Sequence, residues 1–369
     1  MQFIYQLADW PKLRWDERAI AGLVGEVRHA QGKLAGKMQM LGFPLEQEAV
    51  LATLTEDVLK SSEIEGEILS RDQVRSSVAR RLGMDIGALA EPDREVEGVV
   101  EMMLDATQSF AAPLSDERLF AWHSALFPTG RSGMTRIQVG AWRDDTTGPM
   151  QVVSGPYGRQ KIHFEAPAGN RMPAEMAAFL AWYNVPSEID AVVKAAIAHL
   201  WFVTIHPFED GNGRIARAIA DMSLARSEAS PRRFYSMSAQ IRAERNAYYA
   251  ILEKTQSGDL DCTEWLLWFL HCLARAITGA EATLASVLHK HAVWERIKTH
   301  DLNDRQRLLI NRLLDGYEGK LTTKKAALHV KASHDTALRD IEDLIKRGIL
   351  QKDGAGGRST SYSLVAGSP

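Results

Sequence analysis

The sequence predicts a mostly α-helical protein with one β-hairpin near its middle and a smaller helical unit at its C-terminal end. Three observations support this. Apolar residues recur at spacings of three and four over most of the first 300 residues. The segment 137–166 is instead rich in glycine and proline, with short β-branched pieces on either side of "SGPYGRQ", which predicts the hairpin. From about residue 301 the helical patterns become shorter and end in the glycine-rich "QKDGAGGRSTSYSL".

The helices follow from the apolar spacing in order. The first pattern covers 16–60, with Pro44 as a break between two helices. The next helices are expected from Asp93 and from Ser115, whose hydroxyl suits an N-cap. Beyond the hairpin, helical patterns cover 173–184, 190–205, 214–227, 246–256 and 262–277.

The C-terminal segment contains three helical patterns, at 304–317, 322–330 and 333–350, and then a hairpin pattern. This is the order of a winged helix, so we expect three regions: 1–92, 93–290 and 301–369. A small surplus of Lys and Arg after residue 300 suits DNA, but acidic residues such as Asp340 and Glu342 in the third helix oppose phosphate approach. The sequence therefore leaves open whether this domain binds DNA or a protein.

Composition narrows the class of protein. The chain has 369 residues, 45% of them hydrophobic, and a net charge of −3, so no global basic field points to nucleic acid. Its two cysteines, Cys262 and Cys272, form no CxxC pair, which is typical of a reducing compartment. We see neither a signal peptide nor an apolar run long enough to cross a membrane. We expect a cytoplasmic protein.

The stretch "HPFEDGNGRIAR", residues 206–217, concentrates reactive groups in a loop that opens a helix. A helix N-terminus presents unpaired N–H groups and a partial positive charge, which together bind anions. Gly211 and Gly213 allow the backbone to approach an anion closely. Arg214 and Arg217 are three residues apart, so both guanidinium groups lie on one side of the helix, where they suit a polyphosphate.

Two further side chains of this stretch suit chemistry at a phosphate. Asp210 offers the hard oxygen ligand that Mg²⁺ prefers when it bridges phosphates. His206 is the residue of the motif best suited to move a proton near neutral pH. Each feature alone is more often structural, since a "GNG" is usually a turn and helix arginines are usually solvated. Together they predict nucleotidyl or phosphoryl transfer, with His206 as the base for an incoming hydroxyl.

The stretch matches, position by position, the HPFx[D/E]GNGRxxR signature of the Fic family, and the resemblance extends over roughly residues 93–275. Most Fic proteins transfer AMP to a hydroxyl of a target protein. The resemblance implies a Fic-type helical core in which the hairpin is a target-docking flap, with Gly155–Gly158 at its tip. It also implies roles for single residues: His206 as catalytic base, Asp210 for the metal, Gly211, Asn212, Gly213 and Arg214 for the α- and β-phosphates, Arg217 for the γ-phosphate, and Tyr249 as the adenine wall. Gln256 stands where some relatives have asparagine, which leaves the base preference open.

A second stretch, "SSEIEGE", resembles the [S/T]xxxE[G/N] motif of Fic proteins that carry an N-terminal inhibitory helix. Ser61 and Glu65 fit that motif, which places the inhibitory helix around 55–66. A carboxylate paired with Arg217 would take the place of the γ-phosphate. The resemblance therefore implies an enzyme that inhibits itself.

The sequence thus predicts a protein adenylyltransferase that uses ATP and Mg²⁺ and modifies a Ser, Thr or Tyr hydroxyl of a target protein. Two alternatives stay open. The same site can remove AMP from a modified protein, with Glu65 orienting a water. The chain can also be a DNA-binding regulator whose core senses a nucleotide. The target protein and homodimer formation are open as well.

Overall fold

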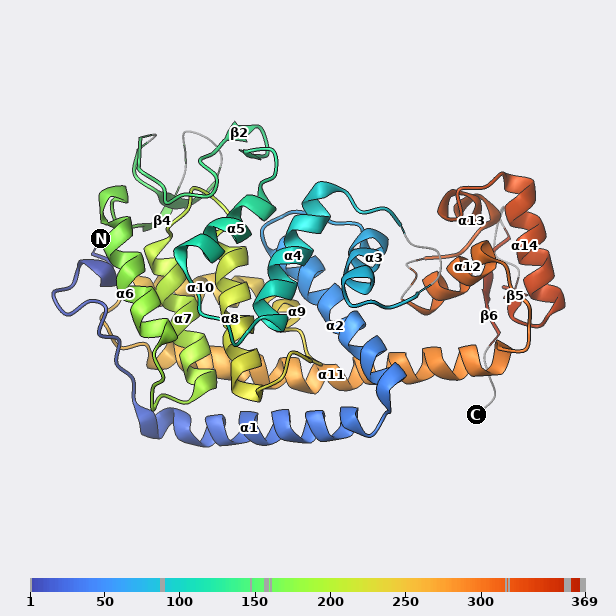
Figure 1. The fold of residues 1–369 in the computed structure, drawn as a ribbon, viewed down its shortest axis with the longest axis horizontal. Coiled ribbons are helices and arrows are strands. Elements are labelled where there is room, and N and C mark those ends of the chain that lie inside the picture. Colours follow the sequence, from blue (N-terminus) through green and yellow to red (C-terminus); the bar gives the residue numbers. More distant parts are fainter. Residues whose placement is uncertain are drawn as a thin grey trace. The chain divides into compact units, whose positions relative to one another are not determined.

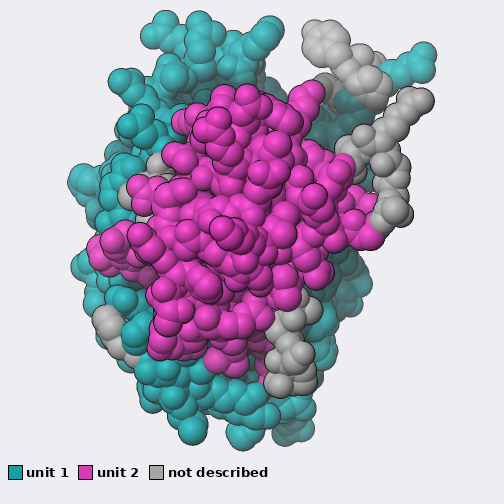
Figure 2. Space-filling model, turned by 90° about the vertical axis from the view of Figure 1, so that its right-hand side faces the viewer, with its two compact units in different colours: residues 1–81, 91–280 teal, residues 82–90, 281–369 magenta. Residues whose placement is uncertain are grey.

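The computed structural model describes residues 2–86, 90–146, 148–155, 159, 161–315, 317, 319–354 and 360–365. The described chain divides into two compact units. The larger contains residues 1–81 and 91–280, and the smaller contains 82–90 and 281–369 (Figure 2). The domain boundaries expected from the sequence stay a prediction.

The protein is mostly helical, as predicted (Figure 1). The α-helices of the larger unit are α1 (Glu17–Gln39), α2 (Phe43–Ile64), α3 (Arg71–Arg81), α4 (Arg94–Gln108), α5 (Asp116–Leu126), α6 (Met172–Asn184), α7 (Ala191–Ile205), α8 (Asn212–Glu228), α9 (Met237–Ala243) and α10 (Arg245–Gln256). The long helix α11 (Thr263–Ile297) begins in the larger unit and ends in the smaller one.

Helix starts in the larger unit are fixed by short polar side chains. Asp16, Asp93, Ser115 and Asp190 each accept a hydrogen bond from a backbone N–H in the first turn of the helix that follows. Ser115 is the N-cap predicted from the sequence. The core is centred on α7, which is buried from Val192 to Ile205 except at Lys194 and packs along α8. Helices α7 and α8 follow each other in the chain and pack together, so the loop 206–211 between them is anchored at both ends by a buried helix.

The predicted hairpin consists of β3 (Gln151–Ser154) and β4 (Lys161–Glu165), which pair antiparallel with an irregularity between Val152 and Val153. Of the expected flap tip, 156–158 lie outside the described residues. A smaller hairpin, β1 (Arg131–Ser132) and β2 (Thr135–Arg136), precedes it and was not predicted. The 3-10 turns η1 (Ile4–Gln6) and η2 (Gly169–Arg171) complete the larger unit.

The smaller unit contains α12 (Asp304–Leu314), α13 (Thr323–His329) and α14 (His334–Lys346), followed by the antiparallel pair β5 (Leu350–Lys352) and β6 (Tyr362–Leu364). This order agrees with the expected one, and the winged-helix assignment stays a prediction. Asp340 of α14 is buried and pairs with Arg305, and Asp343 pairs with Arg347. Two of the acidic groups of this helix are therefore neutralised within their own unit.

Within the described part of the chain, no helix is both long enough and apolar enough to cross a membrane.

Candidate active site

His206 lies at the point where α7 ends. Its backbone is left-handed, with φ 53° and ψ 59°, and its N–H donates to the Phe202 carbonyl at 2.9 Å. A non-glycine residue in this region is uncommon because its Cβ crowds the neighbouring carbonyl. The conformation ends α7 abruptly and turns the chain into the loop 207–211.

The imidazole of His206 is half-buried and has one defined partner, the Val203 carbonyl, which lies 3.1 Å from Nδ1. A carbonyl only accepts, so Nδ1 carries the proton and Nε2 keeps a lone pair. Burial lowers the pKa of His206 to about 4. The hydrogen bond to the Val203 carbonyl opposes this shift, the nearby Arg143 charge lowers the pKa further, and the charges of Glu65 and Asp210 raise it by smaller amounts. The ring is therefore neutral at pH 7, the state a proton acceptor needs.

The loop after His206 is closed by Asn212. Its side-chain oxygen accepts from Phe208 N at 2.9 Å, and its Nδ2 donates to Phe208 O at 2.8 Å. The N-cap Gly211 has φ +80°, and a Cβ there would lie 2.9 Å from the Phe127 ring. The side chain of Asn212 is thus used to hold the loop, so any contact with an anion would come from its backbone.

Arg217 points into the first turn of α8 and is almost completely buried. Its Nε donates to Ser61 Oγ at 3.0 Å, and its Nη2 donates to Ser61 O and to Glu65 Oε1, both at 2.8 Å. A Cβ on Gly213 would lie 2.3 Å from Glu65 Oε1. A carboxylate from the end of α2 therefore rests on the bare backbone at the N-terminus of α8.

Arg214 is held by a second carboxylate, which the sequence analysis did not single out. Its Nη1 donates to Glu67 Oε2 at 2.5 Å, and its guanidinium lies 5.0 Å from the centre of the Phe127 ring. Gly66, between the two glutamates, has φ +90°, a conformation that glycine adopts readily. Arg214 Nε and Arg217 Nη1 are buried without a hydrogen-bond partner in the described structure. Two guanidinium groups at one helix end thus keep unused donors.

Asp210 lies at the edge of this helix end. One oxygen accepts from Gly211 N at 2.6 Å, and the other accepts from the Ser132 hydroxyl. The described residues contain no group of three or more His, Cys, Asp or Glu that could hold a metal by themselves. Mg²⁺ commonly takes only one or two carboxylates and completes its shell with phosphate oxygens and water. A single carboxylate beside an anion site is compatible with that donor set.

Tyr249 lies on α10 and is 36% exposed. Burial raises the pKa of its hydroxyl, and so does the nearby charge of Glu65. Arg245 lies over its ring at 5.2 Å. The structure therefore brings a partly exposed aromatic face close to the Glu65–Arg217 pair. Gln256, at the end of the same helix, is buried and donates to Thr204 Oγ1 at 3.2 Å.

This arrangement combines two buried guanidinium groups at the start of α8, a neutral imidazole six residues before that helix begins, and an adjacent carboxylate. Residues 113–224, which include all of these except the α2 carboxylates and Tyr249, match the family model described as "Fic/DOC family". Residues 113–224 form a Fic domain. Residues 3–84 match a second model, described as a domain of unknown function, DUF4172.

Similar proteins agree with the family match. The chain is 39% identical over 88 residues to the protein adenylyltransferase fic-1 of Caenorhabditis briggsae, covering 23% of this chain and 16% of that protein. It is 26% identical over 215 residues to the protein adenylyltransferase Fic of Culex quinquefasciatus, covering 54% of this chain and 38% of that protein. The match thus spans well under half the length of these relatives.

The fold likeness covers the whole chain. The crystal structure of a Fic family protein from Desulfovibrio desulfuricans G20 has a TM-score of 0.53 and 22% sequence identity, and the comparison covers 100% of both chains. The Fic-type fold predicted from the motif is therefore confirmed.

The hairpin of the Fic domain is tied to α10 by a polar cluster. Lys161 and His163 of β4 both contact Glu253, at 3.1 and 2.7 Å, and Ser154 of β3 lies 2.6 Å from the other ring nitrogen of His163. Glu253 is one helical turn beyond Tyr249. The hairpin is thus linked to the helix that bears the aromatic face of the site.

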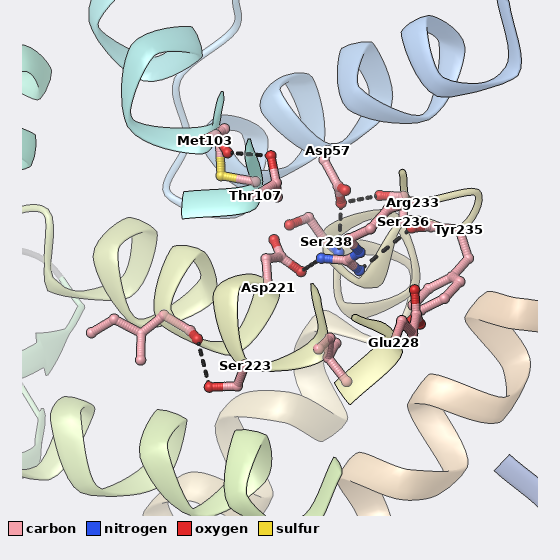
Figure 3. A network of polar contacts seen from close by, with 12 residues as sticks. Asp57, Met103, Thr107, Asp221, Ser223, Glu228, Arg233, Tyr235, Ser236 and Ser238 are labelled. Carbon is pink, nitrogen blue, oxygen red and sulfur yellow. Dashed lines mark hydrogen bonds and ion pairs between the residues drawn. The ribbon is translucent and has the colours of Figure 1, made fainter. Parts of the chain in front are cut away.

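Helix α2 is anchored to the Fic domain by a buried polar network (Figure 3). Asp57 of α2 accepts from the Ser236 hydroxyl and from Ser238 N, and Asp221 of α8 pairs with Arg233. Burial, together with the neighbouring Asp221, raises the pKa of Asp57 to about 7. Asp57 thus ties α2, and therefore the segment that carries Glu65, to the start of α9, while Asp221 joins α8 to Arg233 just before that helix.

Proposed function

We propose that this protein transfers AMP from ATP to a Ser, Thr or Tyr hydroxyl of a target protein. The observation that carries the proposal is the Glu65 carboxylate, which rests on Arg217 and on the bare backbone of Gly213. A carboxylate there marks an anion site at the start of α8, and the neutral ring of His206 belongs to the loop that leads into it. The names of the similar proteins, protein adenylyltransferases, support the same activity.

In this proposal, His206 Nε2 accepts the proton of the target hydroxyl. The hydroxyl oxygen forms a bond to the α-phosphorus of ATP, the bond from that phosphorus to the β-phosphate oxygen breaks, and pyrophosphate leaves. Arg214 and Arg217 would hold the phosphates with the donors that lack partners, Arg214 Nε and Arg217 Nη1, and with those now given to glutamate. Backbone N–H groups of Gly211, Asn212 and Gly213 complete the cradle.

Two further groups complete the nucleotide site. Asp210 would hold Mg²⁺ together with phosphate oxygens, and the ion would neutralise charge on the leaving pyrophosphate. Tyr249, which is partly exposed, would pack its ring against the adenine ring. Gln256 is buried, and its side chain donates to the Thr204 hydroxyl. This contact does not indicate which nucleotide base the site prefers, so that preference stays open.

We further propose that the segment 61–67 inhibits the enzyme, with one carboxylate for each arginine. Glu65, supported by Ser61, occupies Arg217, and Glu67 occupies Arg214. Both arginines are almost completely buried, so each pair is shielded from water on the arginine side. ATP must displace these carboxylates before its phosphates reach both guanidinium groups.

Labelling with α-³²P-ATP tests the proposal. We compare the wild type, Glu65→Gly, and the double variant Glu65→Gly with Arg217→Ala, each alone and with a cell lysate. Glu65→Gly should raise self-labelling by about tenfold or more, since ~1.4 kcal/mol corresponds to one decade. The double variant should lose most of that gain because the freed partner is absent. Equal labelling of all three proteins would refute the inhibition, and the absence of label from all three would refute the transfer.

Removal of AMP from a modified protein is the second candidate. The side chain of Glu65 is 30% exposed while it is bonded to Arg217, so its carboxylate can also orient a water. A substrate already labelled with AMP distinguishes the two directions. If Glu65→Gly leaves transfer unchanged but stops the release of AMP, removal becomes the main activity.

A further inference from the structure

Arg143 lies outside the twelve-residue motif, 63 positions before His206, yet it contacts the motif directly. Its side chain is only 2% exposed. Its Nε donates to the His206 carbonyl at 2.8 Å, and its backbone N–H donates to the Pro207 carbonyl at 3.0 Å. Two successive carbonyls at the turn out of α7 are therefore held by one residue.

The same guanidinium reaches both ends of the β3–β4 hairpin. Its Nη1 pairs with Asp145, before β3, and its Nη2 donates to the Pro167 carbonyl, after β4. Asp145 itself accepts from Gly169 N, so the two ends are also joined directly. They are in close contact, because a Cβ on Gly169 would lie 2.7 Å from the Asp144 carbonyl carbon. Arg143 thus joins the catalytic loop to the start and the end of the hairpin.

His206 needs such support. Its left-handed backbone is one that a residue with a Cβ adopts only when its surroundings hold it there. Phe202 holds its N–H, Val203 holds Nδ1, and Arg143 holds its carbonyl. Of these three contacts, the one from Arg143 is the only one that comes from outside α7.

We propose that Arg143, together with Asp145, is a positioning pair that sets the ring of His206 relative to the β3–β4 hairpin. It does not touch the reacting atoms. It fixes the direction of Nε2 with respect to the strands on which a target segment would lie, so that the target hydroxyl meets the base. The inference rests on the proposed function, in which His206 is the proton acceptor.

Replacing Arg143 with lysine or with glutamine separates the effect of the guanidinium's shape from the effect of its charge. Lysine keeps the positive charge but has no planar fork with which to hold three acceptors at once, and glutamine has neither property. Arg118 provides a matched control. It also pairs with a carboxylate, Asp105, and donates to backbone carbonyls, but it ties α5 to α4 rather than to His206. Variants Arg143→Lys, Arg143→Gln, Asp145→Asn and Arg118→Lys are made in the Glu65→Gly background, where self-labelling is expected to be measurable.

The expected result is a split between kinetic constants. Arg143→Lys and Arg143→Gln should lower the maximal self-labelling rate by at least tenfold and leave the KM for ATP within about twofold. Asp145→Asn should lower the rate less, because the guanidinium keeps its carbonyl contacts. Arg118→Lys should leave the rate unchanged even if it lowers Tm as much as Arg143→Lys does. An equal fall in rate for Arg118→Lys and Arg143→Lys, or a KM that rises as much as the rate falls, would overturn the proposal.

A spectroscopic measurement keeps the inference independent of activity. In the parent, the ¹⁵N chemical shifts of the His206 ring should report the tautomer protonated at Nδ1, assigned by comparison with His206→Ala. Arg143→Gln should broaden or shift these signals toward a mixture of tautomers, whereas Arg118→Lys should not. If the parent shows the expected tautomer but transfers no AMP, the proposed function fails and the positioning role survives. Unchanged ring signals in Arg143→Gln would sink the positioning role alone.

Discussion

At the scale of single residues, the site is described by the hydrogen bonds and ion pairs that its histidine and its two arginines already make. His206 has its Nδ1 occupied by a carbonyl and its Nε2 available, and its lowered pKa keeps it neutral at pH 7. Arg214 and Arg217 are each held by a glutamate. The first fact bears on the proposed role of His206 as a base, and the second on the proposed inhibition.

Replacing His206 with alanine should abolish transfer and spare ATP binding, because the imidazole moves a proton and holds no phosphate. The expected loss in rate is at least the ~10²–10⁴ of general base catalysis. Self-labelling in the Glu65→Gly background and calorimetry with an ATP analogue measure the two effects. Near-normal labelling would remove His206 from the reaction.

Replacing Glu67 with glutamine should strengthen the binding of Mg-ATP, because Arg214 then keeps no carboxylate partner. The side chain of Glu67 is 45% exposed, so we discount the pair to the ~0.2–1 kcal/mol of partly solvated ion pairs, which corresponds to at most about fivefold in Kd. Glu63→Gln is the control, since Glu63 pairs with Lys60 and Arg242 instead. Weaker ATP binding in Glu67→Gln would show that Glu67 assists the nucleotide.

Sequence reasoning found the residues of the two motifs but missed Glu67 and Arg143. "SSEIEGE" contains Glu67, yet the pattern it resembles ends at the glycine before it. The sequence did contain a signal for Glu67, because the first motif region has two glutamates on either side of a glycine and the other motif has two arginines with which they could pair. Arg143 offered no signal. Its role depends on contacts across 63 residues that no local spacing encodes.

At the scale of elements, helix α2 matters because it presents Glu65 to α8. Its position is fixed by Asp57 within a buried cluster of two carboxylates and one arginine (Figure 3). A carboxyl whose pKa is raised in the folded state binds more protons there than in the unfolded chain. The free energy of unfolding therefore falls as the pH rises from about 4 through 7.

Asp57→Asn should remove this dependence, since an amide oxygen can still accept from Ser236 and Ser238 but cannot be charged. Relative to wild type, the variant should gain about 3 kcal/mol in the free energy of unfolding between pH 5 and pH 8, because the wild type loses ~1.4 kcal/mol per pH unit between pH 5 and the folded pKa of about 7. Urea unfolding of both proteins at both pH values measures the difference. The same difference in stability at pH 5 and at pH 8 would contradict the raised pKa.

The element predictions succeeded where apolar spacing was regular and failed where it was not. Pro44 lies in the first turn of α2, as a predicted break should. Helix α3 was missed because "RDQVRSSVARR" has few apolar residues, although Val74 and Val78 face inward at a spacing of four. Helix α11 runs to Ile297, well past the expected 277, and its later residues Val293 and Ile297 belong to the core of the smaller unit.

At the scale of the whole molecule, the fold class could be predicted and much of the arrangement could not. One motif of twelve residues implied the Fic-type core, and the likeness to a solved Fic family protein along the full chain agrees with it. The contacts that bring 61–67, 143–145 and 206–217 together are long-range, so they depend on packing rather than on local pattern.

The most direct test of AMP transfer follows the fate of the two ends of the triphosphate. Glu65→Gly protein is incubated with Mg²⁺ and ATP labelled either at the α- or at the γ-phosphate, and label bound to protein is measured after denaturation. If His206 directs a hydroxyl to the α-phosphorus, α-label stays on the protein and γ-label is released as pyrophosphate. Retention of γ-label with release of the α-label as ADP would mean phosphoryl transfer, and would contradict the account.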